Sequence, residues 1–70
     1  MLRQEAIALL KELGDGGLIQ PLFVIIEKQT EDKFQLKIKG SYDINQIDSF
    51  LKNRRFTYEK SKDYLIIFKQ

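Results

Sequence analysis

The chain has 70 residues, 31% of them charged, with a formal net charge of +2 and no cysteine or histidine. These absences exclude a disulfide scaffold, a zinc site with nitrogen or sulfur ligands, and catalysis by a cysteine or histidine. A chain of this length forms one domain with a thin core, so we expect a single domain over residues 1–70 that self-associates; the alternative is a monomer whose own packing suffices.

The first predicted element is an amphipathic helix over residues 2–13, because apolar residues recur there at helical spacing. Residues 14–17, Gly-Asp-Gly-Gly, follow it, and glycine readily adopts the left-handed conformation that closes helices. This run also resembles a phosphate-cradling loop, but it follows a helix and precedes a strand, which is the wrong order for such a site. We therefore interpret it as a connector, with anion binding by its free amides as the alternative.

A β-hairpin is predicted next. Residues 18–29 are rich in β-branched and aromatic side chains, and the continuous apolar run Leu22 to Ile26 is typical of a strand that is covered on both faces. Pro21 has no amide donor, so we expect the paired stretch to begin after it. A polar turn at residues 29–32 leads into residues 33–39, which alternate strictly between polar and apolar. The residues expected to face inward are Phe34, Leu36 and Ile38.

A second helix begins near Asp43, which is placed to cap it, with Gln46 completing a capping box. Tyr42 and Ile47 are spaced for a hydrophobic staple across this helix start. The cations Lys52, Arg54 and Arg55 gather at the C-terminal end, where the helix dipole favours positive charge. The predicted buried stripe consists of Ile44, Ile47, Phe50 and Leu51.

Two further strands, residues 56–60 and 63–69, complete the chain, and the last is apolar on both faces. The order helix, strand, strand thus occurs twice. Residues 34–39 can be aligned with residues 64–69, which indicates either an internal duplication or two hairpins that resemble each other through patterning alone.

These elements predict an α+β fold, a two-layer sandwich with a four-stranded, mainly antiparallel sheet and two helices on one face, in the order α-β-β-α-β-β. The other sheet face would expose apolar side chains such as Phe23 and Ile25, or Leu65 and Ile67. Apolar patches of that size usually mark an interface. A dimer that pairs sheet faces or strand edges would bury them.

The distribution of charged and apolar residues also bears on where in the cell the protein is located. Charged residues interrupt the apolar N-terminal segment, so it has no continuous core of a signal peptide or a membrane span. We expect a cytoplasmic protein without membrane contact, which the lack of cysteine fits. The many Lys, Glu and Ile residues would also suit a thermophilic source.

Side chains for catalysis or metal binding are few. The only carboxylate groups placed to hold Mg²⁺ or Ca²⁺ are Glu31-Asp32 and Asp43 with Asp48. We interpret the first pair as a solvated turn and Asp43 as a helix cap. The sequence therefore predicts no catalytic residue, no metal, no cofactor and no small-molecule substrate, and we expect a binding protein rather than an enzyme.

Positive charge is concentrated in the second half of the chain. Residues 1–32 hold three basic and six acidic side chains, whereas residues 33–70 hold nine basic and four acidic ones. Lysines there alternate along one strand, and residues 52–58 interleave cations with aromatic rings, the two ingredients of nucleic-acid binding. The predicted contacts to RNA or DNA are Arg54, Arg55, Lys52, Lys37, Lys39 and Tyr58.

Two interpretations of these basic residues stay open. In the first, Tyr58 and Tyr64 stand beside Arg54 and Arg55 on one surface that binds nucleic acid. In the second, lysines protect a strand edge, aromatic rings pack the core, and the chain is a homodimeric protein-protein interaction module without a nucleic-acid role or catalysis.

Overall fold

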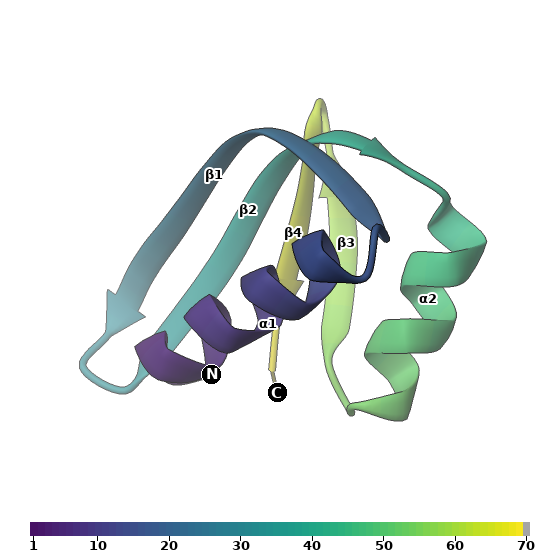
Figure 1. The fold of residues 1–70 in the computed structure, drawn as a ribbon. Coiled ribbons are helices and arrows are strands. Elements are labelled where there is room, and N and C mark those ends of the chain that lie inside the picture. Colours follow the sequence, from purple (N-terminus) through teal and green to yellow (C-terminus); the bar gives the residue numbers. More distant parts are fainter. Residues whose placement is uncertain (70) are drawn as a thin grey trace.

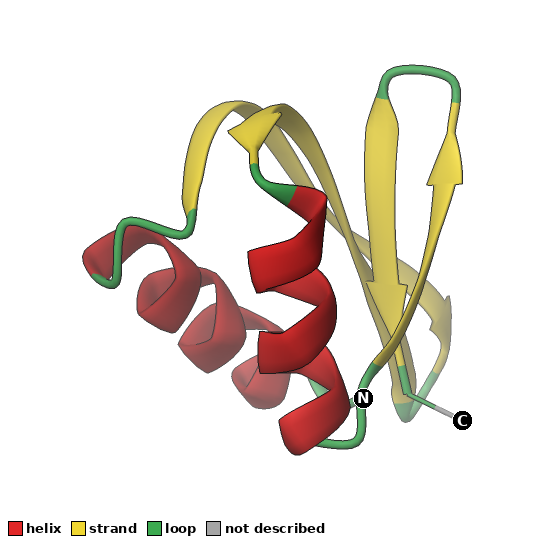
Figure 2. Cartoon of the chain, turned by 90° about the vertical axis from the view of Figure 1, so that its right-hand side faces the viewer, coloured by secondary structure: helices red, strands yellow, loops and turns green. Residues whose placement is uncertain are grey.

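A computed structural model describes residues 1–69 of the chain, so residue 70 of the predicted domain lies outside the described residues. The four strands form one sheet in the order β1-β2-β4-β3, and every neighbouring pair is antiparallel. Both helices lie on the same face of this sheet (Figures 1 and 2). The predicted α+β fold is thereby confirmed. Its elements are α1 (Arg3–Asp15), β1 (Ile19–Thr30), β2 (Lys33–Tyr42), α2 (Ile44–Asn53), β3 (Thr57–Ser61) and β4 (Tyr64–Phe68).

The core lies between the helices and the two central strands. Leu36 pairs with Ile67 and Ile38 pairs with Leu65, so these four side chains share the face that the helices cover. All four are fully buried, and full burial of such a side chain stabilises a fold by roughly 2 kcal/mol. The inward positions predicted for β2 are confirmed. From the helices, the buried residues are Ala6, Leu9, Leu13, Ile47 and Leu51.

Helix α1 ends as its glycines predict, although two residues later than expected. Gly17 has a φ of 70° in the left-handed region. The Leu18 N–H then donates to the Leu13 carbonyl at 3.0 Å, and the Gly17 N–H donates to the Gly14 carbonyl at 3.1 Å. This pair of bonds satisfies carbonyls that a helix end leaves free.

Helix α2 begins at the predicted cap and ends in the same geometry as α1. The Asp43 carboxylate accepts a hydrogen bond from the Asn45 N–H at 2.8 Å. At the other end Arg55, with a φ of 63°, takes the left-handed position, and the Phe56 N–H donates to the Leu51 carbonyl at 2.9 Å. A side chain in this conformation costs about 1 kcal/mol relative to glycine.

A bulge shapes the first hairpin. Pairing between β1 and β2 begins at Ile19, so the expectation that it starts after Pro21 is wrong. The register instead shifts between Pro21 and Phe23, where a bulge tolerates a residue without an amide donor. Gly40 lies opposite Pro21, and a side chain there would collide with the backbone of Gln20 and approach the Pro21 Cα to 2.9 Å.

The two helix-strand-strand halves meet at the β2–β4 pair. The strand order is symmetric about this junction, with Lys37 opposite Ile66 at its centre. A two-fold rotation there exchanges Leu36 with Leu65, because Leu36 pairs with Ile67 and Leu65 pairs with Ile38. The alignment of residues 34–39 with residues 64–69 is therefore displaced by one residue, since it matches an inward position to an outward one.

Candidate functional site

The six predicted contact residues lie on two opposite sides of the sheet. Lys37 and Lys39 alternate with the buried residues of β2, so they project from the open face that no helix covers. The other four, Lys52, Arg54, Arg55 and Tyr58, belong to α2, the following turn and the helix-covered side of β3. The structure therefore does not gather the six into one surface.

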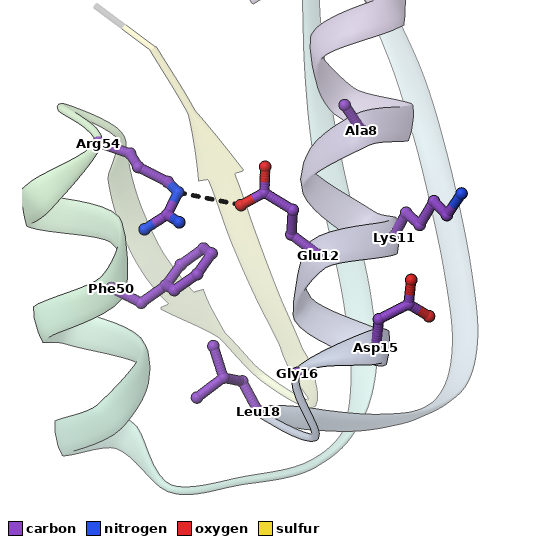
Figure 3. A pocket seen from close by; sticks show the side chains of 8 residues that line it. All are labelled: Ala8, Lys11, Glu12, Asp15, Gly16, Leu18, Phe50 and Arg54. Carbon is purple, nitrogen blue, oxygen red and sulfur yellow. Dashed lines mark hydrogen bonds and ion pairs between the residues drawn. The ribbon is translucent and has the colours of Figure 1, made fainter.

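On the helix side, Arg54 bridges the two helices. Its Nε donates to Glu12 Oε2 at 3.0 Å, and its guanidinium lies 3.8 Å from the centroid of the Phe50 ring. Figure 3 shows Arg54 and Glu12 pointing toward each other across a cleft of about 590 Å³ between α1 and α2. Arg54 thus has an acidic partner and an aromatic partner within the protein.

Tyr58 and Lys52 share one carboxylate. The Tyr58 hydroxyl donates to Asp48 Oδ1 at 2.7 Å, and Lys52 Nζ lies 3.1 Å from Asp48 Oδ2. The hydrogen bond from Tyr58 is the main reason that the pKa of Asp48 is lowered, and the same bond raises the pKa of Tyr58. Arg55 is exposed, and no ion pair of it is found among residues 1–69.

Tyr58 and Tyr64 lie on opposite faces of the sheet. Tyr58 pairs with the buried Ile67 and packs against the core, whereas Tyr64 is one residue from the buried Leu65 and points to the open face. The surface expected from Tyr58, Tyr64 and the two arginines is therefore not formed. The reason is that adjacent strand residues point to opposite faces.

The open face carries three aromatic side chains, from β1 and β4. Phe23, on β1, is 52% exposed, and Tyr64 and Phe68, at the two ends of β4, are half-buried. Phe23 pairs with Lys39, so its cross-strand neighbour on β2 is a lysine. Phe23 was predicted only as an exposed apolar residue, and Phe68 was not predicted as part of a binding surface. The alternation of Tyr64, Ile66 and Phe68 was the available signal. The alternative exposed pair, Leu65 and Ile67, is instead fully buried on the helix side.

Apolar and charged side chains alternate across the centre of the open face. Ile25 pairs with Lys37, Lys37 with Ile66, and Ile66 with Glu59. Ile66 is only 9% exposed although no helix covers it, because the longer side chains of Lys37 and Glu59 flank it. The cover that the apolar strands require thus comes partly from neighbouring polar side chains.

Lys37 and Lys39 each have an acidic neighbour. Lys37 Nζ lies 3.2 Å from Glu27 Oε2, and Lys39 Nζ lies 3.7 Å from Asp63 Oδ2. The amide of Gln35 also donates to Glu27 at 2.8 Å. Ion pairs on a wet surface contribute only about 0–1 kcal/mol, so a stronger anion can replace these carboxylates.

Within residues 1–69, no group of three potential metal-ligating side chains is found, and no helix is long and apolar enough to cross a membrane. Asp43 and Asp48, proposed above as candidate ligands, are engaged as a helix cap and as the partner of Tyr58. Comparisons with protein-family models, curated proteins and solved structures find no match.

Proposed function

We propose that this protein binds single-stranded nucleic acid on the open face of its sheet. The observation that carries the proposal is the presence of three aromatic rings, Phe23, Tyr64 and Phe68, on the same uncovered face as Lys37 and Lys39. Unpaired bases stack on exposed rings, and lysines neutralise the phosphates between them. A duplex keeps its bases stacked inside, so single strands are the better ligand.

The arrangement of the strands supports this assignment. Strand β2 lies between β1 and β4, so its lysines stand between the aromatic ring of β1 and the two rings of β4. Tyr64 and Phe68 are four residues apart on one strand, a separation of roughly 13 Å. This spacing leaves room for successive bases to stack along β4 while the backbone follows the lysines.

The test is fluorescence anisotropy with labelled single-stranded RNA, single-stranded DNA and duplex, at two salt concentrations. Tyr64→Ala should weaken single-strand binding by about 1–3 kcal/mol, the usual value of one stacked base. The double variant Lys37→Gln and Lys39→Gln should instead reduce the salt dependence, by a slope of roughly 0.7 for each phosphate that the lysines no longer neutralise.

The matched control lies on the helix side. The double variant Arg54→Gln and Arg55→Gln removes the same amount of charge as the lysine pair, and we expect it to leave affinity and salt slope nearly unchanged. If this variant loses binding while Tyr64→Ala retains it, the contacts lie at the end of α2 instead. Absence of binding at low salt contradicts the proposal and favours a protein-protein interaction module.

A further inference from the structure

The two edges of the sheet differ in how open they are to another strand. Strand β3 is short, at five residues, and its edge carries Glu59 and Lys60. Strand β1 has 12 residues and includes the apolar run Phe23 to Ile26. Its outer side has no neighbouring strand among residues 1–69. The free backbone groups of such an edge are a template for strand pairing.

Features that normally protect an edge lie at the two ends of β1 and not in its middle. Proline and bulges are common protective devices, and here Pro21 and a register shift stand before Phe23, while a second shift follows Lys28. Between them, residues 23–28 pair regularly with β2. An uninterrupted window of six residues therefore remains available on the outer side.

The side chains of this window and of the adjacent bulge are incompletely covered. Leu22, in the bulge, is 81% exposed and Phe23 is 52% exposed. Val24, Ile25 and Ile26 are only half-buried, because they have a neighbouring strand on one side alone. A partner strand would bury apolar side chains on both faces of the sheet at once.

We propose that two copies of the chain pair antiparallel through β1, with Ile25 facing Ile25 of the second copy, so that one sheet of eight strands forms. This pairing places Val24 opposite Ile26 on the helix side and Phe23 opposite Glu27 on the open side. The inference does not depend on nucleic-acid binding. It also joins the two open faces into one continuous surface.

The register follows from which side chains would meet. Directly opposite residues of an antiparallel pair lie on the same face of the sheet. Alternative registers therefore shift one strand by two residues at a step, so that every side chain keeps its face. One step in one direction places Val24 opposite Lys28, and a further step places Glu27 opposite Glu27, a repulsive pair. One step in the other direction brings Pro21 and the bulge into the pairing. Among the registers that leave Pro21 and the bulge outside the pairing, the Ile25 register has the longest central run of apolar pairs, three in succession, and it avoids like charges.

Introduced cysteines test the register directly, because the natural chain has no cysteine. Ile25→Cys should form a disulfide-linked dimer under mild oxidation, since opposed residues in an antiparallel pair have suitably close Cβ atoms. The Phe23→Cys variant alone should form few cross-links, because its two cysteines would not lie opposite each other. Mixed with the Glu27→Cys variant it should cross-link efficiently, because the proposed register places Phe23 opposite Glu27. The control is Glu59→Cys, on the same face at the β3 edge. Equal cross-linking of Glu59→Cys and Ile25→Cys contradicts the proposal.

Light scattering tests the assembly itself. The wild-type protein should have twice the 8.3 kDa mass of the chain, and Ile25→Lys should raise the dimer dissociation constant at least tenfold, whereas Glu59→Lys should leave it unchanged. Far-UV circular dichroism verifies folding; if the lysine variant unfolds, Ile25→Thr, which keeps strand propensity, provides the comparison. A monomer mass for the wild type at submillimolar concentration overturns the proposal, whatever the result of the nucleic-acid titration.

Discussion

The two helix-strand-strand halves of the chain reach the same arrangement with different residues. The first half closes its helix with Gly17 and places Gly40 where two backbones nearly touch. The second half closes its helix with Arg55 and joins α2 to β3 through the bond between Tyr58 and Asp48. Glycine relieves strain in the first half, whereas the second half retains strain at Arg55. Equivalent topology therefore does not require equivalent local chemistry.

The largest expected effect tests the crowded glycine of the first half. Gly40→Ala should lower the free energy of unfolding by about 3 kcal/mol, because the new Cβ would collide with the backbone of Gln20. Gly14→Ala is the matched control: its Cβ meets no atom within 4 Å and it lies in α1, so it should stabilise by up to about 1 kcal/mol. Urea denaturation measures both. Similar midpoints for the two variants would show that the bulge can relax.

A reciprocal exchange at the two helix ends sharpens the comparison. Gly17→Ala should cost about 1 kcal/mol because of the positive φ, although space is free around it. Arg55→Gly should stabilise the protein by roughly 0.5 kcal/mol, since glycine occupies this conformation without strain but loses more chain entropy on folding. Thermal unfolding at neutral pH reports both changes. A loss of stability in Arg55→Gly would mean that the side chain stabilises the fold by more than its strain costs.

The smallest expected effect concerns pH. The pKa of Asp48 is lowered in the folded protein, mainly by Tyr58, and that of Glu5 is lowered, mainly by the Leu2 N–H. A carboxyl with a lowered folded pKa stabilises above its unfolded pKa, and this contribution is lost as pH falls through the folded pKa. Stability should therefore decline below about pH 4.

Two variants measure how much each half of the chain contributes to this pH dependence. Asp48→Asn should remove the acid-sensitive contribution of the second half, and Glu5→Gln that of the first half, as measured by urea denaturation at neutral and acidic pH. Tyr58, whose pKa is raised, affects the pH dependence of stability in the opposite direction. Its contribution to stability is present at lower pH and is lost as pH rises through the folded pKa. If neither variant changes the slope at acidic pH, other carboxyls dominate the acid response.

Sequence patterning alone determined the elements and much of their orientation. The alternation of residues 33–39 identified Leu36 and Ile38 as inward, and the glycine run and Asp43 identified a helix end and a helix start. These features depend on neighbours within a few residues, so periodicity and capping chemistry suffice to predict them. Patterning does not determine how two hairpins align when both alternate between polar and apolar residues. For this reason the proposed repeat alignment was displaced by one residue.

Only the tertiary structure decided the strand order, the open face and the partners of the basic residues. The strand register separates Tyr58 from Tyr64, and chain folding brings Arg54 to Glu12 and Lys39 to Asp63. The sheet order also leaves β1 at an edge, with its apolar window uncovered. Such contacts join residues far apart in the chain, and the local pattern that specifies each segment does not encode which distant segment will lie beside it.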